Sequence, residues 1–575
     1  MKFYHRIILL FLISTLVYFN LRGIKWGIPS KERTELIFPK QFRNESFYLL
    51  MKQTRDDIYK LSGGSPIGRL KDSSSSLSPI LQSTGVQENE NLFFTGDKKM
   101  LANFIRPYLL RSNHTDEQMT IASLGGMHPK SFDFNPRIFQ YGGVYIYGMG
   151  AWLGLSHVLG FAKISSDISF YFRQPEEMEK IFAAGRMLNS VFLIILGLTI
   201  FLIAKKIYSV NTALWSVLFF SVSPAFVFQS RIMKPYIMAT SFSMLCLYYS
   251  VMIIKSQPEA KNYILSGIFT GLTAGTMPVY GIIIIAPLIA HFTISKKFNK
   301  NLLYVFLTTA LVFVITNPYW IIKFNDAYGE IKSTGKLYAT GGLTAFLNFF
   351  LYQLPHISSV GLLMVCLLGL LFAMLNIKKS EILLLSVGVI PLLIFGWLLK
   401  NQSLSMHNTR FLLPWLSIML ILASRVIDVF SRKKYVGILV IILVLFIVVK
   451  TALNSLACVQ NFVIDSSANS TRLTAGRWIR DNIPANSIIG TNYMPEPAHL
   501  PPFDFSRYKI EIIRNYDIKK WPEYFICVNE VPKEILNGKN YTLTQSFKPV
   551  DKMLGIKFNI GYNHINSLVT IYKKI

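Results

Sequence analysis

Charged residues are scarce in this sequence, and acidic residues are the scarcer kind. Only 16% of the 575 residues are charged, whereas a soluble domain carries about a quarter. Lys and Arg number 59 against 31 Asp and Glu, a formal net charge of +28. In a soluble protein this excess would indicate nucleic acid. Because 51% of the residues are apolar and the basic ones lie in loops, it indicates membrane topology here, or an anionic lipid or phosphate-bearing substrate, and no nucleic acid.

Cysteine and cofactor motifs are also scarce. The four cysteines exclude a disulfide framework; Cys246 and Cys366 lie in apolar runs, and only Cys458 and Cys527 are expected outside the membrane, where a single disulfide is possible. There is no Walker loop, no dinucleotide fingerprint, no zinc-spaced Cys/His cluster and no clear Asp-x-Asp pair in the first outer loop. We therefore expect no cofactor, and a metal-independent reaction.

Long apolar runs dominate the remaining chain. Met187 to Ala204 and Val436 to Val449 contain no charged residue and predict membrane-spanning helices. Spans are predicted at 186–204, 211–229, 236–254, 263–277, 279–294, 302–317, 357–375, 382–399, 411–428 and 435–450. The N-terminal run at 6–22 resembles a signal peptide without a cleavage site, which predicts an uncleaved first span. The predicted fold class is a polytopic α-helical membrane protein with about eleven spans.

Basic clusters follow every second predicted span. They occur at Lys205-Lys206, Lys255 to Lys261, Lys296 to Lys300, Lys378-Lys379 and Arg432 to Lys434. Short basic loops stay on the cytoplasmic side of a membrane. This rhythm predicts a cytoplasmic N-terminus, and the odd number of spans predicts a C-terminus on the outer side.

Two stretches are predicted to lie mainly outside the membrane. Residues 23–185 form a long first outer loop, with a polar run at Asp72–Ser78 that is typical of a flexible tip. Within this loop, 141–160 could span or lie in the interface; the interface is favoured because another crossing would move Lys205 outside. Alternating runs in 451–575 predict a small α/β domain. The predicted organisation is a membrane module at 1–450 and a periplasmic domain at 451–575.

Several polar and aromatic motifs stand at predicted outer ends of spans. The acids Asp116 and Glu117 follow Ser112-Asn-His-Thr, and an aromatic, Gly-rich segment runs from Tyr141 to Tyr147. Further along the chain come Arg186, Ser223-Pro224 with Arg231, Asn317-Pro318-Tyr319, and Arg410 before Pro414. In this order the motifs resemble the lipid-linked glycosyltransferases of the GT-C class, family 39, which includes protein O-mannosyltransferases and bacterial aminoarabinose transferases.

The resemblance implies a function and a set of site residues. It implies inverting transfer of a sugar from a polyprenyl-phosphate carrier to a glycan, lipid or protein acceptor, at the periplasmic face of a bacterial inner membrane. Asp116 would be the base, supported by Glu117 or Glu32. The phosphate contacts would be Arg231, Lys234, Arg410 and Arg186, and the acceptor or membrane lipid would contact Tyr141 and Tyr145. The chain departs from the family where Gly142-Gly143 replaces Pro-Pro, and a long insertion precedes Asp116, so Glu32 could take its place.

Structural roles remain open for the same residues. Thr115 or Asp116 could cap a helix through Leu124, with Glu117 in its first turn. Glu32 could pair with Arg33 in solvent, the arginines could reach lipid headgroups, and the tyrosines could anchor the interface. Two other functions also remain. A transporter or flippase of lipid-linked glycans would need ionisable residues at the membrane midplane, and a non-catalytic scaffold would bind partners through its outer domain.

Overall fold

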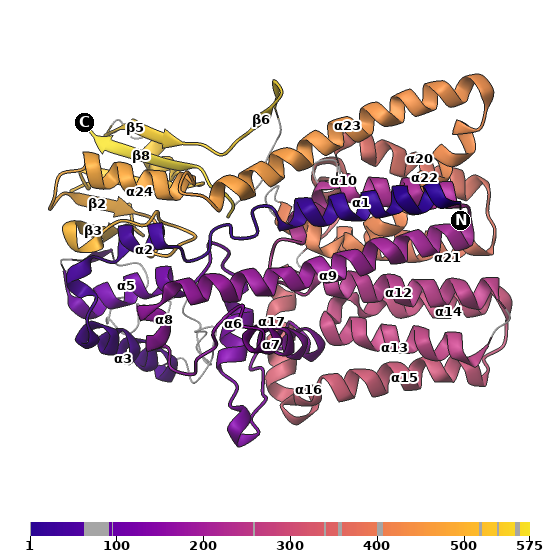
Figure 1. Cartoon of the computed structure of the whole chain (residues 1–575), viewed down its shortest axis with the longest axis horizontal. Helices are drawn as coiled ribbons and strands as arrows, with labels where there is room; N and C mark the ends of the chain where they lie inside the picture. The colour runs from indigo at the N-terminus through magenta and orange to yellow at the C-terminus, as the bar shows by residue number, and fades with distance from the viewer. Residues whose placement is uncertain are drawn as a thin grey trace.

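The computed structural model describes residues 2–61, 91–94, 96–256, 259–338, 341–354, 359–398, 406–516, 520–537, 540–557 and 564–575. The polar run Asp72–Ser78, which we predicted to be a flexible tip, lies outside these residues. The described chain has two parts along its long axis, a bundle of long helices and a smaller part with helices and a sheet (Figure 1).

The bundle contains a helix, or two successive helices, at the position of each predicted span. Its elements are α1 (Phe3–Leu21), α9 (Pro175–Ile207), α10 (Val210–Val222), α11 (Pro224–Gln229), α12 (Tyr236–Lys255), α13 (Ala260–Thr276), η3 (Pro278–Ile284), α14 (Ile285–Ile294), α15 (Lys300–Thr316), α20 (Val360–Leu375), α21 (Lys379–Leu398), α22 (Leu413–Ser431) and α23 (Lys434–Asp465). Among the described residues, six helices are long and apolar enough to cross a membrane: α1, α9, α12, α21, α22 and α23. The predicted fold class is confirmed and the chain is a multi-pass membrane protein; the count of eleven spans stays a prediction.

The helix α9 begins earlier than the sequence suggested. We expected this span at 186–204, but the helix starts at Pro175. Proline is favoured in the first turn, and Glu176 and Glu177 complement the positive end of the helix dipole there. Arg186 therefore lies inside the helix rather than at the end of a span, where the sequence placed it.

Basic loops gather at one end of the bundle. In Figure 1, the connections from α14 to α15 and from α22 to α23 lie on the right, at the end where the N-terminus lies. The C-terminus and the sheet lie at the opposite end. This is the asymmetry that the positive-inside rule describes, although which side faces the cytoplasm stays a prediction.

The helix α23 presents an apolar surface outward. Only 17% of its most apolar window is buried within the protein. Exposed side chains along it include Ile438, Leu439, Ile442, Leu443 and Phe446. A contiguous apolar surface of this kind is unfavourable in water and is solvated by lipid tails, so this face lies against the bilayer.

The smaller part combines the first outer loop with the C-terminal tail. Its main helices are α2 (Lys31–Ile37), α3 (Glu45–Leu61), α5 (Lys98–Leu110), α6 (Glu117–Gly125), α7 (Gly143–Val158), α8 (Ser169–Arg173), α24 (Thr471–Asn482) and α25 (Lys533–Asn537). Near them lie α16 (Pro318–Ile322) and α17 (Phe324–Tyr338), followed in the chain by α18 (Leu343–Asn348) and η4 (Phe349–Gln353). Short helical turns occur at η1 (Lys40–Phe42), η2 (Pro129–Ser131), η5 (Met406–Phe411) and η6 (Phe505–Arg507).

One sheet joins distant parts of the chain. Its strands are β1 (Leu92–Phe94), β2 (Ile488–Thr491), β3 (Lys509–Ile512), β4 (Tyr524–Val528), β5 (Tyr541–Phe547) and β8 (Val569–Lys574), in the order β1-β3-β2-β4-β8-β5. β2 is parallel to β3 and β4, whereas β1 and β8 are antiparallel to their neighbours. A separate hairpin pairs β6 (Lys552–Met553) with β7 (Ile556–Lys557). The predicted α/β character of the tail is confirmed, and an edge strand from the first outer loop completes the sheet.

A single apolar core binds the first outer loop to the tail. Phe94, Phe104 and Tyr108 from the loop pack with Phe505 and Ile510 from the tail. Burying such side chains stabilises by roughly 1.5–3 kcal/mol each. The two segments therefore fold onto each other, and the predicted domain boundary at residue 450 stays a prediction.

The structure also describes the segment 141–160, which could span the membrane or lie in the interface, and the two cysteines Cys458 and Cys527. α7 is seen nearly end-on in Figure 1, whereas the bundle helices run across the view, so it crosses the end of the bundle. The disulfide considered between Cys458 and Cys527 is absent, because the two thiols are free and buried in different apolar clusters.

Candidate active site

Three charged side chains meet at the end of the bundle that carries the sheet. Asp116 directly precedes α6, Lys234 lies in the turn between α11 and α12, and Arg410 lies in η5 before α22. Proline shapes two of these turns: Pro224 starts α11, and Pro235 directly precedes α12. Residues far apart in sequence therefore reach the same site.

The Asp116 carboxylate is paired with both cations. It accepts a hydrogen bond from the Lys234 ammonium, and its Oδ2 lies 3.5 Å from Nη1 of Arg410. The Lys234 and Arg410 side chains are only 1% and 7% exposed, whereas Asp116 is 31% exposed. An acid that a substrate can reach is thus held beside two buried positive charges. The Asp116 side chain does not cap α6, so its expected capping role is wrong.

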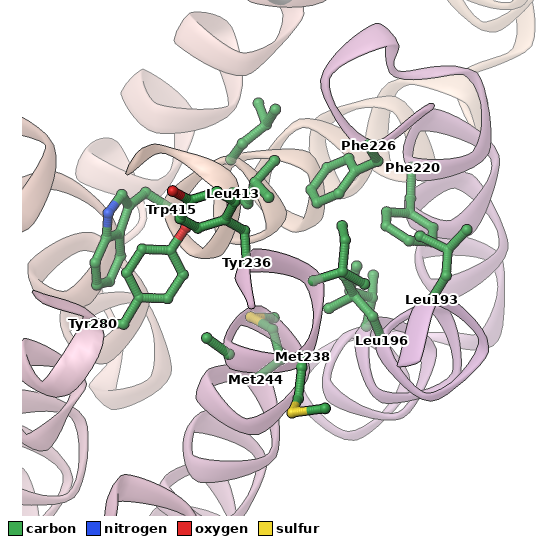
Figure 2. Close-up of a cluster of buried hydrophobic side chains, with 14 of the residues drawn as sticks. Leu193, Leu196, Phe220, Phe226, Tyr236, Met238, Met244, Tyr280, Leu413 and Trp415 are labelled. Atoms are coloured by element: carbon green, nitrogen blue, oxygen red, sulfur yellow. The ribbon is translucent and has the colours of Figure 1, made fainter. Parts of the chain in front are cut away.

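Aromatic side chains support the cations. The Tyr236 ring lies 5.3 Å from the Lys234 ammonium and 6.0 Å from the Arg410 guanidinium, within the range of cation–π attraction. The Tyr280 hydroxyl donates to the Arg410 carbonyl. Figure 2 shows Tyr236 and Tyr280 with Leu413 and Trp415 on one side of a buried cluster. Its other side holds Leu193, Leu196, Phe220 and Phe226.

Glu117 serves a different purpose from its neighbour Asp116. It is fully buried, and its two oxygens accept from Nε and Nη2 of Arg186 at 2.9 and 2.7 Å. It also accepts from the Ser112 hydroxyl and the Met233 amide. Arg186 in turn donates to the carbonyls of Ile24 and Trp26. A bidentate pair with this many partners fixes α6 against α9 and the turn before Lys234, and leaves Glu117 out of reach of an acceptor.

Arg231 is bound within the protein backbone. Its buried guanidinium donates to the carbonyls of Val227, Phe19 and Arg22. It joins the turn after α11 to the end of α1 rather than reaching lipid headgroups. Of the four cations predicted to contact phosphate, Lys234 and Arg410 lie against Asp116, while Arg186 and Arg231 act as internal braces.

Of the remaining predicted residues, Glu32 lies on the surface, whereas Tyr145 is buried next to α6, where the Thr120 hydroxyl donates to it. Glu32 is exposed in the first turn of α2, and its neighbour Arg33 donates instead to the carbonyls of Gly27 and Arg111. Tyr141 and Tyr145 are buried and meet edge to face with their ring centres 6.0 Å apart. Their predicted role as interface anchors is therefore wrong, because neither ring reaches the surface.

Two histidines missed in the sequence lie beside this cluster. The Asp116 amide donates to Nδ1 of His114 at 3.2 Å, and the His114 ring centre lies 5.2 Å from that of His564. Burial, reinforced by Arg472, lowers the pKa of His564 to about 4. His114 stands two residues before Asp116, whereas no sequence signal links His564, in the C-terminal tail, to this site.

The cluster is chemically suited to an anion. Ammonium and guanidinium groups donate charge-assisted hydrogen bonds, and the guanidinium fork matches two phosphate oxygens. A carboxylate beside them can take a proton from a hydroxyl that approaches the same point. Among the described residues, no group of three or more His, Cys, Asp or Glu side chains forms a candidate metal site.

Known proteins resemble parts of this chain. The oligosaccharyltransferase of Archaeoglobus fulgidus in its apo form is 12% identical, with a TM-score of 0.41 over 77% of this chain and 59% of that one. ArnT from Cupriavidus metallidurans in the apo state is 10% identical, with a TM-score of 0.38 over 75% and 88%. Arabinofuranosyltransferase AftD from Mycobacteria is 13% identical, with a TM-score of 0.38 over 74% and 35%.

The chain spans 47–59% of the archaeal enzyme's length in its several structures. No curated protein sequence matches the chain. Residues 179–320, from α9 to α16, match the family described as dolichyl-phosphate-mannose-protein mannosyltransferase. This segment includes Arg186, Lys234 and Tyr236. The resemblance inferred from the ordered motifs is therefore confirmed for this segment by its family match.

Proposed function

We propose that this protein is a glycosyltransferase that moves a sugar from a polyprenyl-phosphate carrier to an acceptor at the outer membrane face. In a bacterial cell this would be the periplasmic face of the inner membrane, with the N-terminus cytoplasmic and the C-terminus periplasmic. The matching family is named for a lipid-phosphate-linked mannose donor, which supports this donor class. Residues 1–450 would form the membrane module and 451–575 its outer domain.

A single observation carries the proposal. An accessible carboxylate, Asp116, lies against two buried cations, Lys234 and Arg410, at the end of a membrane bundle. Transfer from a lipid phosphate needs this combination at one membrane depth, because the reaction generates negative charge on the phosphate and releases a proton from the acceptor.

The reaction follows from these positions. The acceptor hydroxyl attacks the anomeric carbon, and the bond from that carbon to the phosphate oxygen breaks. The electron pair of this bond stays on the polyprenyl phosphate, where Lys234 and Arg410 stabilise it. The hydroxyl proton passes to Asp116. Attack from the side opposite the leaving group inverts the anomeric configuration.

The internal braces keep this geometry. The pair Glu117–Arg186 ties α6 to α9, and the Glu117 carboxylate also holds the Met233 amide beside Lys234. Asp116 and Lys234 are therefore held close together, because their chain neighbours Glu117 and Met233 are hydrogen-bonded to each other. We assign Glu117 and Arg186 as positioning residues. We assign Tyr141 and Tyr145 to packing behind the segment that carries Asp116.

The test is release of free polyprenyl phosphate by the purified full chain in lipid nanodiscs. Asp116→Asn should lower the rate by about 10²- to 10⁴-fold, the usual contribution of a general base. Glu35→Gln is the matched control, because it removes an exposed acid of α2. Unchanged release in Asp116→Asn, with normal protein level, would overturn the assignment.

The structure disfavours the flippase alternative. The buried ion pairs of the described bundle lie toward its two ends: Glu381 is in the first turn of α21 with its partner Arg425 in the second half of α22, and Arg186, inside α9, meets Glu117 at the start of α6. A transporter would instead need such groups at the midplane. A flippase would relocate intact donor across the membrane without releasing polyprenyl phosphate, so the same assay separates the two functions.

A further inference from the structure

A polar cavity lies next to the candidate active site, at the junction of the first outer loop, α23 and the C-terminal tail. Its volume is about 50 Å³. Its lining includes Arg33 from α2, Asn113, Asp465 at the end of α23, and Arg472 from α24. Exposed Glu32 stands at its rim. A water needs roughly 10–15 Å³ of such space, so the cavity could hold a few waters or part of a small polar ligand.

Three buried charged residues of the lining keep unused hydrogen-bonding capacity within the described structure. Nε of Arg33 and Nε of Arg472 are without a hydrogen-bond partner, and the Asp465 carboxylate, which the Asn113 side chain and the Asn566 amide face, makes no hydrogen bond of normal geometry. The other guanidinium nitrogens are occupied: Arg33 donates to Gly27 and Arg111, and Arg472 to His564, Ala498 and Ser567. A buried polar group without a partner costs about 1–3 kcal/mol, so a ligand or ordered water would relieve this cost.

The mixture of charges defines the chemistry of a ligand. A simple anion would meet the Asp465 carboxylate, and a simple cation would meet the guanidinium groups of Arg33 and Arg472. A hydroxyl suits both, because it donates one hydrogen bond and accepts others. Neighbouring hydroxyls, as on a sugar ring, can donate to the carboxylate while they accept from the two guanidinium groups.

The cavity is close enough to serve the same substrate as Asp116. Asn113 lines the cavity and stands three residues before Asp116, which limits their Cα separation to roughly 11 Å. This is the length of about two sugar rings. A saccharide bound in the cavity could therefore extend a neighbouring hydroxyl toward the acid.

We propose that this cavity is a saccharide subsite that holds a sugar of the acceptor. The proposal rests on the proposed function and specifies its acceptor as a glycan-bearing molecule. The Asp465 carboxylate accepts from ring hydroxyls, Arg33 and Arg472 donate to them, and the reacting hydroxyl lies toward Asp116.

Saccharide binding tests the subsite separately from catalysis. The probes are the methyl glycosides of mannose, galactose and N-acetylglucosamine, added to the full chain in nanodiscs and followed by saturation-transfer NMR. At least one should bind the wild type. Ser467→Trp should weaken its binding at least tenfold by filling the cavity, and Ala468→Trp is the matched control because Ala468 is exposed next to it and outside the lining. Asp465→Asn provides a second variant that keeps the side-chain volume.

The outcomes are distinct. Binding that Asp116→Asn retains and both Ser467→Trp and Asp465→Asn lose supports the subsite. The proposal is overturned if no glycoside binds the wild type, if the Ser467→Trp protein binds normally, or if inorganic phosphate displaces the glycoside equally well, which would indicate an anion site. Polyprenyl-phosphate release that depends on Asp116, without glycoside binding, would leave the transferase function standing and remove the subsite alone.

Discussion

The carboxylate of Asp116 accepts a hydrogen bond from the ammonium of Lys234, although the two residues lie 118 positions apart in the chain. Arg410, another 176 residues beyond Lys234, completes the group through the same carboxylate oxygen (410 − 234 = 176). Three turns at the ends of different helices thus build one site.

Loss of the Lys234 charge should weaken binding of the donor phosphate and also slow the step in which that phosphate leaves. A hydrogen bond to a charged group contributes about 1.5–3 kcal/mol, so Lys234→Met should raise the KM for the lipid-linked donor roughly 10- to 100-fold. Steady-state kinetics with a synthetic polyprenyl-phosphate sugar measure this. Lys52→Met is the control, because Lys52 pairs with Asp167 on the exposed surface. An unchanged KM for the Lys234 variant would place the phosphate elsewhere.

The pair Glu117–Arg186 should dominate the stability of the outer end of the bundle. Both side chains are fully buried, and removal of one partner of such a pair costs about 3–5 kcal/mol, because the other charge stays buried alone. Glu117→Gln should therefore lower the free energy of unfolding in detergent by that amount. Asp481→Asn, which breaks the half-exposed pair with Arg480, should change it by less than about 1 kcal/mol. Equal effects of the two substitutions would contradict the bracing role.

Acid should destabilise the junction between the tail and the active site. The pKa of His564 is about 4 in the folded protein and about 6.5 in an unfolded chain, so between these values the unfolded state binds the extra proton. The stability that neutral His564 provides is complete above about pH 6.5 and is lost as the pH falls toward 4. The full difference amounts to about 3 kcal/mol.

Thermal unfolding at several pH values measures this effect. His564→Gln should flatten the decline of the midpoint temperature between pH 6.5 and 4. His128→Gln, at an exposed position, should leave the decline as it is in the wild type. A wild-type midpoint that is constant over this range would show that His564 is not buried in neutral form.

The approach of α7 to the bundle should require glycine at two positions. A Cβ at Gly142 would collide with the carbonyl oxygen of Gly275, and one at Gly143 with that of Thr316. Gly142→Ala should therefore displace α7 and reduce activity at least tenfold. Gly154→Ala in the same helix meets nothing within 4 Å and should be neutral or stabilise by about 0.5–1 kcal/mol. Full activity in Gly142→Ala would mean that α7 can shift without disturbing the site.

Much of the fold follows from local properties of the sequence. Hydropathy and basic loops predict where each span lies, because a helix in lipid needs apolar side chains along most of its length and basic residues stay in the loops. The strand β4 is a short run of apolar and β-prone residues within the tail that was predicted to be α/β. The edge strand β1 was not predicted, because three residues have no periodicity of their own and are held by pairing with β3.

The division of roles between Asp116 and Glu117 could not be predicted from their sequence. The two acids are adjacent, and either could have been the base. Successive residues at a helix start point about 100° apart, so one side chain turns inward to Arg186 and the other faces Lys234 and Arg410. Similarly, Arg231 and Arg410 both stand at turns that the sequence predicts to be outside, yet Arg231 donates to backbone carbonyls and Arg410 lies against the Asp116 carboxylate.

The sequence by itself determined which segments form apolar helices and which residue types could build a site, because hydropathy and charge act residue by residue. Only the tertiary structure decided which acid meets which cation, and that His564 and Asp465 from the last third of the chain lie beside a loop near residue 115. These pairings depend on how helices that are hundreds of residues apart in sequence pack together, and a local sequence pattern cannot predict such contacts.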